Sequence, residues 1–252
     1  MTLADPRLLR LPLIVLLAFV VESTAGFGAT IVTVTLGALF LPIDTVLAQF
    51  LPVNVLLSAY LVGSARRAVD RRLLFRSMLP WIGVGVAVGL VVARLRFDRA
   101  LLPAYFGAFV VVLSVAELAR RSETTPPKLG PLVRSTALLG AGVVHGLFAS
   151  AGPLVVWVAA REVEDKTAFR ATLAALWLVL NVVVLGGFVY DGAIGRESLR
   201  ASATLLVPLV LGTAIGHVLH RRASPRAFRL AVYVLLLAAG LTLVARPLLA
   251  SR

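Results

Sequence analysis

Residues 145–156 read HGLFASAGPLVV, and this stretch decides how the rest of the chain is interpreted. It lies inside a long apolar run, yet Gly152 and Pro153 interrupt any helix that would continue through it. No Asp, Glu, Lys or Arg accompanies the break, as one would in a polar surface loop. At membrane depth, non-helical backbone is tolerated only where protein or a water-filled cavity satisfies its polar groups. We therefore expect this break to line a cavity.

The composition is that of a polytopic membrane protein. Hydrophobic residues make up 60% of the 252 residues and the mean hydropathy is +0.96, whereas a soluble domain is roughly 45–50% apolar. We expect the N-terminal apolar stretch to be the first membrane segment rather than a cleaved signal peptide. Six further runs approach the ~20 residues that cross a bilayer core: 45–63, 77–93, 100–116, 171–190, 201–219 and 230–245.

The net charge of +13 does not indicate a nucleic-acid partner, because the basic residues lie in clusters between the apolar runs rather than on one face. If each hairpin returns to its own side, one side carries 16 of the 25 Lys and Arg residues and the other carries 9. The richer side is expected to be cytoplasmic, which puts both termini outside a prokaryotic inner membrane.

Several function classes are disfavoured by what the sequence lacks. There is no cysteine for a disulfide, a thiol nucleophile, a Cys-ligated zinc site or an iron–sulfur cluster. There is also no Walker motif, nucleophile elbow or His-Glu-x-x-His helix. We therefore expect no enzyme, no metal and no cofactor.

The chain contains two similar halves, 1–119 and 131–252, joined by a polar linker with prolines at 120–130. Val20-Val21-Glu22 aligns with Val143-Val144-His145, and in each half a small-residue break, a short apolar piece, an acidic turn and three long apolar runs follow. The pieces after the breaks, 28–41 and 153–160, would rise only about 21 Å and 12 Å, against a core of ~30 Å.

These lengths predict an all-α membrane protein of two repeats, each a broken or re-entrant helical hairpin followed by three transmembrane helices. Because three full spans is an odd number, the repeats are expected to be inverted. Inverted repeats with broken helices near the midplane are typical of secondary transporters.

At these motifs the chain resembles the TauE/SafE family of sulfite and organosulfonate exporters. The family pattern Gly-Leu-Phe-Gly-x-Gly-Gly-Pro, an acidic turn and Phe-Arg-Ala-Thr is matched here by residues 146–153, Asp165 and residues 169–172. The Gly-x-Gly of the first half is 26–28. Ala149 and Ala151 stand where the family has glycine, and each added methyl narrows a site that backbone lines. The resemblance implies a small-anion exporter.

The residues themselves indicate an anion site. Half-helices that start near Gly28 and Gly152 present free N–H groups and the positive end of a helix dipole, and Pro153 suits the first turn of a helix. Small residues also serve helix packing, which is the alternative role for any one of them. The predicted substrate-binding residues at the two breaks are Gly26, Phe27, Gly28, Ala151, Gly152 and Pro153.

Glu22 and His145 occupy matching places just before the breaks. Ionisable groups at membrane depth are costly and tend to be functional, and histidine changes charge near neutral pH. We hypothesise that one of them carries a coupling proton. The alternative is a neutral packing residue held by hydrogen bonds.

Four more polar residues are candidates for binding the anion. The guanidinium of Arg170 suits an oxyanion, although the same residue fits a cytoplasmic anchor. Gln49, Asn54 and Asn181 would hydrogen-bond either the substrate or a neighbouring helix.

The sequence thus predicts a secondary transporter that exports a small anion, with the lipid bilayer and possible coupling protons as its other partners. The rival hypotheses are an uncoupled anion channel and a membrane-embedded assembly subunit. The sequence does not indicate an oligomeric state.

Overall fold

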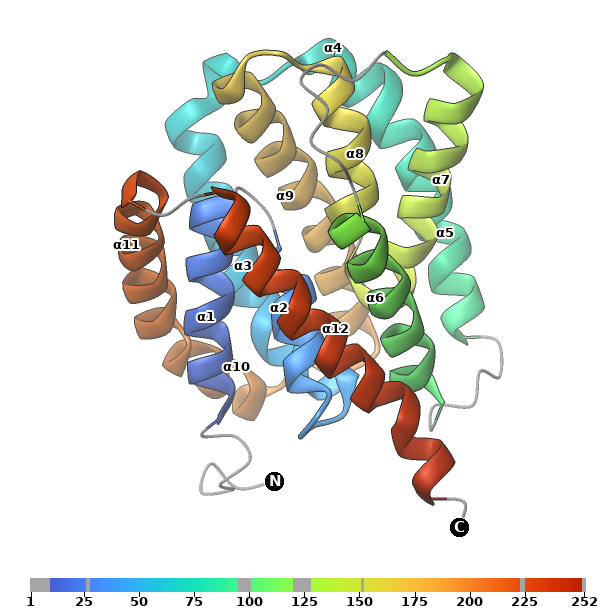
Figure 1. Ribbon diagram of the computed structural model, residues 1–252, viewed down its shortest axis with the longest axis vertical. Helices are drawn as coiled ribbons and strands as arrows, with labels where there is room; N and C mark the ends of the chain where they lie inside the picture. Colours follow the sequence, from blue (N-terminus) through green and yellow to red (C-terminus); the bar gives the residue numbers. More distant parts are fainter. Residues whose placement is uncertain are drawn as a thin grey trace. The chain divides into compact units, whose positions relative to one another are not determined.

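The computed structural model describes residues 10–25, 28–94, 101–119, 128–150, 152–222 and 225–250. Within these residues the chain is helical and has no β-strand, which confirms the predicted fold class. Figure 1 shows the helices, which are α1 (Arg10–Ala25), α2 (Ala29–Gly37), α3 (Ile43–Ala65), the 3₁₀ turn η1 (Arg66–Ala68), α4 (Arg71–Leu73), the π-helical turn η2 (Leu74–Met78), α5 (Leu79–Arg94), α6 (Leu102–Ala119), α7 (Pro131–Phe148), α8 (Gly152–Glu162), α9 (Lys166–Tyr190), α10 (Arg196–Thr204), α11 (Leu206–Arg222) and α12 (Pro225–Ala250).

Six segments of the described chain are long and apolar enough to cross a membrane: Ile43–Ala68, Arg71–Ala93, Leu102–Ala119, Pro131–Phe148, Thr167–Tyr190 and Arg196–Leu219. Five of them overlap predicted runs, and the remaining run, 230–245, lies within α12. The span formed by α7 was predicted as a partial helix. Its 18 residues rise about 27 Å, so the first arm of the second hairpin is longer than predicted.

The helices form two compact units, and each unit draws on both halves of the sequence. Unit 1 comprises Met1–Phe50, Phe97–Ser122 and Gly195–Arg252, and unit 2 comprises Leu51–Arg96 and Glu123–Ile194. In unit 1, α1 packs against α11 and α6 against α12, while in unit 2 α5 packs against α7 (Figure 1). The opening helix of each half therefore packs on a helix from the other half. The inverted arrangement and the repeat boundaries at 120–130 stay predictions.

Glycines allow these helix pairs to approach closely. In unit 2, Gly85 and Gly89 of α5 face Gly142 and Gly146 of α7, and a Cβ added at Gly146 would lie 2.6 Å from the carbonyl oxygen of Val86. Residues four apart share one helix face, and small residues at that spacing let membrane helices pack closely. Gly146, which belongs to the motif shared with the family, is therefore a packing residue.

The contact between α1 and α11 in unit 1 is built similarly, but glycine comes from one side only. Gly212 and Gly216 of α11 lie against α1, where a Cβ added at Gly216 would be 2.6 Å from Cβ of Ser23. The hydroxyl of Thr24 donates a 3.1 Å hydrogen bond to the carbonyl oxygen of Gly216. Packing and a polar contact together fix α1 in unit 1.

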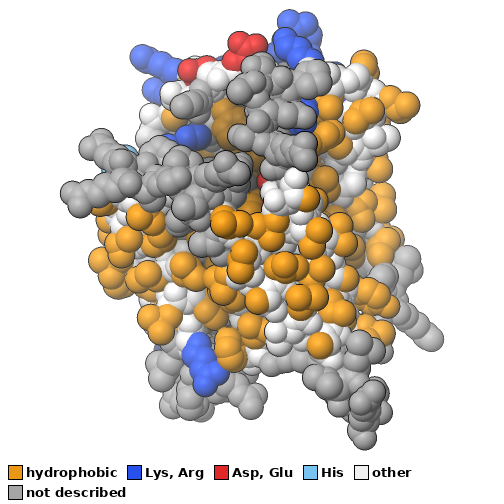
Figure 2. Space-filling view, viewed as in Figure 1, with side chains coloured by type: hydrophobic (Ala, Val, Ile, Leu, Met, Phe, Trp, Pro, Cys, Tyr) orange, Lys and Arg blue, Asp and Glu red, His pale blue; other side chains and the backbone are white. Residues whose placement is uncertain are grey.

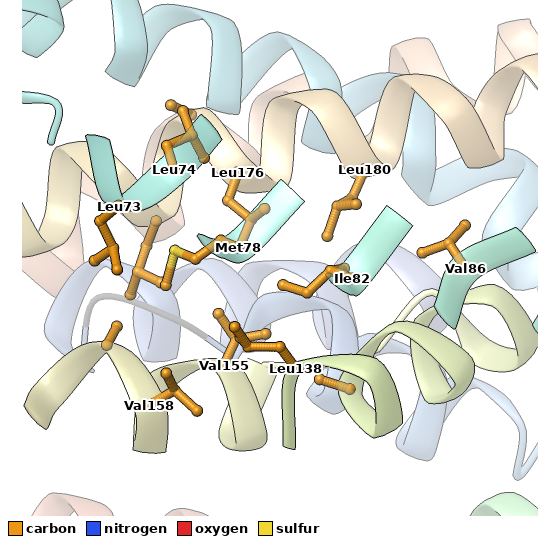
Figure 3. Close-up of a cluster of buried hydrophobic side chains, with 14 residues drawn as sticks. Leu73, Leu74, Met78, Ile82, Val86, Leu138, Val155, Val158, Leu176 and Leu180 are labelled. Atoms are coloured by element: carbon orange, nitrogen blue, oxygen red, sulfur yellow. The ribbon is translucent and has the colours of Figure 1, made fainter. Parts of the chain in front are cut away.

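Unit 2 also has a well-packed apolar interior between α5, α7, α8 and α9 (Figure 3). Its largest fully buried members are Met78, Ile82, Leu138, Leu173 and Leu176. Hydrophobic side chains also spread over the outer surface visible in Figure 2, as expected for helices that face lipid. Burial in unit 2 fixes the positions of α7, α8 and α9, which carry the candidate site.

Candidate functional site

The first break, between α1 and α2 in unit 1, is closed by a carboxylate. Gly28 precedes α2 with a φ of 113°, which lies in the left-handed region that favours glycine. Glu22 lies in the last turn of α1, and its Oε2 accepts a 3.0 Å hydrogen bond from the N–H of Ala29, the first residue of α2. A carboxylate is stabilised at the positive end of a helix dipole. At least one of the N–H groups predicted to be free is therefore bonded within the protein.

The other predicted residues of unit 1 add little to this break. Gly26 and Phe27 lie outside the described residues. Gln49 is buried in α3, where its backbone carbonyl oxygen accepts a 2.7 Å hydrogen bond from the hydroxyl of Ser202. The half-helix α2 has nine residues and rises about 13 Å, which is less than the predicted 28–41 would give.

The second break, between α7 and α8 in unit 2, has a different backbone. Ala149 follows α7 with a φ of 51°, and within the described residues no other non-glycine residue has a positive φ. Its N–H donates a 2.7 Å hydrogen bond to the carbonyl oxygen of His145. The half-helix α8 begins at Gly152, as predicted, with Pro153 as its second residue. Ala151 lies outside the described residues.

Three buried polar side chains at this break lack hydrogen-bond partners in the protein. The side chain of Ser150 lies in the break itself, with the residue 3% exposed. His145 is 1% exposed and its ring stacks on Trp177 of α9 with ring centroids 6.1 Å apart. Neither ring nitrogen makes a hydrogen bond of normal geometry, although the backbone of Leu180 lies near the ring. Asn181 is 2% exposed and its Oδ1 is also unpaired.

The lengths of the helices place these groups within about one helical turn of the break along the helix axes. The 11 residues of α8 rise about 16 Å away from the break. Trp177 lies 11 residues along α9 from its start, again about 16 Å. Asn181 is one turn beyond Trp177, on the same face of α9. A buried polar group without a partner costs about 1–3 kcal/mol, so this part of unit 2 has the chemistry of a polar binding site.

Arg170 does not join this group of residues. It is exposed near the start of α9, seven residues before Trp177, which is about 10 Å along the helix axis. Its position is that of an anchor at the end of a span. Asn54 is buried in the part of α3 that belongs to unit 2.

The motif around Arg170 is largely structural. The hydroxyl of Thr172, a residue 1% exposed, accepts a 2.9 Å hydrogen bond from the N–H of Asp70. Asp165 caps α9 by accepting a 2.7 Å hydrogen bond from the N–H of Ala168. The acidic turn and the Phe-Arg-Ala-Thr segment therefore fix the start of α9.

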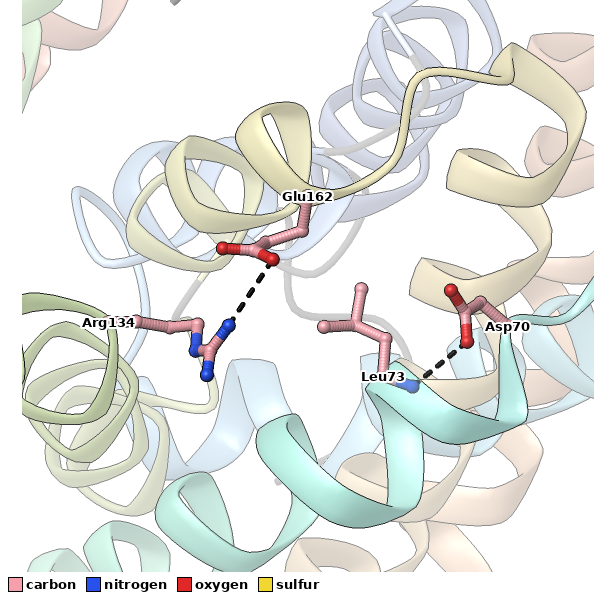
Figure 4. A network of polar contacts seen from close by, with 4 residues as sticks. All are labelled: Asp70, Leu73, Arg134 and Glu162. Carbon is pink, nitrogen blue, oxygen red and sulfur yellow. Dashed lines mark hydrogen bonds and ion pairs between the residues drawn. The ribbon is translucent and has the colours of Figure 1, made fainter. Parts of the chain in front are cut away.

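One end of unit 2 gathers the charged segments (Figure 4). Arg134 of α7 pairs with Glu162 of α8 at 3.3 Å, and Asp70 accepts a 2.9 Å hydrogen bond from the N–H of Leu73. Together with the contact between Asp70 and Thr172, these interactions bring 66–76, 134 and 161–170 to the same end. The Lys and Arg residues of these segments are among the 16 that the sequence predicts to lie on the richer, cytoplasmic side of the membrane.

Sequence reasoning did not select Ser150 or Trp177 as site residues. Ser150 has a clear signal, because it is the polar residue inside the apolar break at 149–151. Trp177 stands four residues before Asn181, so a helical face shared with a predicted site residue would have identified it.

Apolar helices of spanning length make this a multi-pass integral membrane protein, and the two half-helices at broken segments are an arrangement typical of secondary transporters. The sequence model of the family described as 'Sulfite exporter TauE/SafE' matches residues 11–243. The chain therefore belongs to that family. This family places the chain among membrane transporters, as the sequence resemblance implied.

A relative is the probable inner membrane transporter protein TsaS of Comamonas testosteroni. It is 31% identical over 103 residues, which cover 40% of this chain and 43% of the relative. The match thus spans less than half of that relative's length. No solved structure matches the chain. The apolar spans and this relative identify an inner-membrane protein.

Proposed function

We propose that the protein is a secondary transporter that exports a small oxyanion, such as sulfite or an organosulfonate, and that the anion binds in unit 2 beside the second break. The observation that carries this proposal is that Ser150 in the break, His145 in the last turn of α7 and Asn181 in α9 all have buried polar atoms without a partner of normal geometry. The hydroxyl of Ser150 and the imidazole of His145 can donate hydrogen bonds to the oxygens of an anion, and a helix N-terminus favours an anion. Gly152 and Pro153 then serve to begin α8 at the ligand.

In this proposal the first break does not bind the substrate. Because Glu22 bonds to Ala29, an anion at the start of α2 would meet a carboxylate already in place. We therefore assign the substrate to the second break. Gly28 serves to turn the chain so that Glu22 reaches α2. The family description of a sulfite exporter supports the kind of substrate, and the relative's name supports transport.

Glu22 and His145 are the proposed carriers of a coupling proton, with the termini outside. Both are ionisable groups within apolar helices, where such groups tend to be functional. The alternative is an anion channel that uses the same site without coupling. A dependence of flux on the pH gradient that disappears in Glu22→Gln or His145→Ala favours the transporter, whereas gradient-independent flux of many anions favours the channel.

The test is uptake by proteoliposomes that contain the full chain. Sulfite, sulfate, a short alkyl sulfonate and acetate are offered separately, with and without a proton gradient. We expect saturable, gradient-dependent transport of one sulfur oxyanion. If none of the four anions binds or moves, the proposed substrate class is wrong for this chain.

A further inference from the structure

We infer that unit 2 binds the headgroup of an anionic phospholipid at the segment 66–76, which comprises η1, α4 and the start of η2. This segment contains five arginines: Arg66, Arg67, Arg71, Arg72 and Arg76. All five are exposed. The guanidinium group presents a fork of N–H donors that matches the oxygens of a phosphate.

The positive charge of this segment is not neutralised within unit 2. The single acidic residue of 66–76 is Asp70, whose carboxylate accepts a hydrogen bond from the N–H of Leu73. Among the described residues of unit 2, the basic side chains with charged or aromatic partners are Arg134, on Glu162, and Arg161, on Trp157. The five arginines of 66–76 take no part in these contacts, so their donors remain for an outside anion.

An apolar strip follows the arginines along the exposed face of α5. It consists of Trp81, Val84, Val88 and Val91, which are three or four residues apart, and Val84 is 54% and Val91 57% exposed. The opposite face of the same helix carries the buried residues Leu74, Met78, Ile82 and Val86. From Arg76 to Val91 the helix rises about 22 Å, which is enough to accompany one acyl chain through its leaflet.

The order of side chains along this helix favours a phospholipid over other anions. Arginines come first, then aromatic Trp81, then valines, which matches phosphate, interface and acyl chain. A soluble anion would need the arginines alone. A second copy of the same face, related by a two-fold axis, would bring like charges together. Clusters of basic residues beside a membrane helix are known to attract anionic headgroups.

The second half provides a matched control. There α10 opens the span Arg196–Leu219, as 71–76 opens the span Arg71–Ala93. It carries two exposed arginines, Arg196 and Arg200, and the acidic Glu197. This segment has far less net positive charge, so we expect no preference for an anionic lipid there.

Trp81 can report on the bound lipid because it stands inside the strip. The chain has three tryptophans, so Trp157→Phe with Trp177→Phe leaves Trp81 as the sole tryptophan emitter. This background is reconstituted in phosphatidylcholine bilayers that contain either brominated phosphatidylglycerol or brominated phosphatidylcholine. The measured quantity is the ratio of the two quenching constants of Trp81 fluorescence.

We expect brominated phosphatidylglycerol to quench about fivefold more strongly than brominated phosphatidylcholine, given attraction by several arginines. The ratio should fall to about one in Arg71→Gln/Arg72→Gln/Arg76→Gln and stay unchanged in Arg196→Gln/Arg200→Gln. Equal quenching by the two lipids in the parent chain, or an unchanged ratio in the triple variant, would overturn the inference.

Two further arms separate the lipid from other occupants. Soluble glycerol 3-phosphate at millimolar concentration should leave the ratio unchanged, since it lacks the acyl chain that the strip accommodates. If it abolished the preference, the arginines would form a site for free phosphate esters. If neither brominated lipid quenched Trp81, protein would cover the strip and the inference would be wrong. Neither result depends on whether the chain transports sulfite.

Discussion

The two breaks occupy matching places in the two halves of the chain but differ in how their polar groups are satisfied. In the first, Gly28 turns the backbone and the carboxylate of Glu22 caps α2 through Ala29. In the second, His145 stands at the matching position and stacks on Trp177, and its ring nitrogens make no hydrogen bond of normal geometry, with the backbone of Leu180 near the ring. The short helix after the first break is therefore capped by the protein's own carboxylate, whereas the second break is where the proposed function places an external anion.

The two units differ in the kind of buried polar groups they contain rather than in how many of these groups lack partners. Unit 1 also contains buried hydroxyls without partners, those of Thr33, Thr35 and Ser114. It combines them with a carboxylate at the helix start, whereas unit 2 combines Ser150 with an imidazole and an amide. Neutral donors at a helix N-terminus attract an anion, and a carboxylate repels one. Under the proposed function, the residue at this matched position, Glu22 in the first half and His145 in the second, determines which break binds the anion.

The largest loss of stability is expected from a substitution in the contact between α5 and α7, because α7 leads into the second break. Gly142→Ala would drive a methyl group into the carbonyl of Ile82 and the backbone of Gly85. Because backbone cannot move aside as a side chain can, we expect a loss of about 3 kcal/mol in the free energy of unfolding. Thermal unfolding in detergent measures it.

Gly140 is the matched control for this variant, since a Cβ there meets nothing within 4 Å. Gly140→Ala should be neutral or stabilise α7 by about 0.5–1 kcal/mol. Equal effects of the two substitutions would mean that the contact between α5 and α7 does not position the second break.

Removal of the carboxylate at the first break should have the next largest effect. Glu22→Ala leaves the N–H of Ala29 without its acceptor, and a charged hydrogen bond is worth about 1.5–3 kcal/mol. We expect a loss of about 2 kcal/mol in stability. Glu22→Gln keeps an acceptor and should lose less, about 1 kcal/mol, because the charge–dipole attraction is removed.

The same variants test whether Glu22 excludes the substrate from the first break. If Glu22→Ala exposed a second anion site, equilibrium binding of sulfite would show a stoichiometry of two. One site in both the parent and the variant assigns binding to the second break alone. Full stability in Glu22→Ala would show that the bond to Ala29 contributes nothing.

Substitutions of the polar residues at the second break should weaken anion binding without lowering the stability of the protein. His145→Phe keeps a ring against Trp177, and Asn181→Leu nearly keeps the volume, so neither is expected to destabilise unit 2. Each should weaken anion binding at least about tenfold, or ~1.4 kcal/mol. Sulfite binding and uptake, measured beside thermal unfolding, give both values.

Arg170→Lys is the matched control for the polar set. Arg170 is exposed and lies near the start of α9, so we expect less than about a twofold change in affinity if it is an anchor. A tenfold loss in Arg170→Lys, with His145→Phe unaffected, would move the site from the break to the charged end of unit 2.

The sequence was sufficient for features that depend on local chemistry. Gly152 and Pro153 located the start of α8, and uninterrupted apolar runs located the spans, because helix breaking and hydropathy act over a few residues. The matching positions of Glu22 and His145 also followed from the sequence. Their different roles did not, since the bond from Ala29 to Glu22 requires the chain to reverse over seven residues.

Features set by tertiary packing were beyond sequence reasoning. The hydroxyl of Thr172 meets the N–H of Asp70 from 102 residues away, which no local pattern specifies. The stacking of Trp177 on His145 likewise depends on how α9 lies against α7. From the sequence, Gly146 could serve either helix packing or close approach of a ligand. The short distance between α5 and α7 at Gly146 shows that it serves packing.

The smallest expected change in stability comes from substitutions at the residues with left-handed backbone in the two breaks. Ala149 holds a φ of 51°, a left-handed conformation that costs an L-residue about 1–2 kcal/mol. Ala149→Gly removes that cost but adds about 0.4–1 kcal/mol of unfolded-state entropy. We therefore expect a net gain of about 0.5–1 kcal/mol in stability, visible as a small rise in the unfolding temperature.

Gly28→Ala is the reciprocal change at the first break, where φ is 113° and a Cβ would have room, 3.5 Å from Cγ1 of Val21. Its cost should therefore be conformational alone, about 1–2 kcal/mol. Opposite signs for the two variants would show that both breaks need a left-handed residue and that the second carries a strained one. A loss of stability in Ala149→Gly would mean that the methyl group of Ala149, a residue 3% exposed, contributes more by packing than the strained backbone costs.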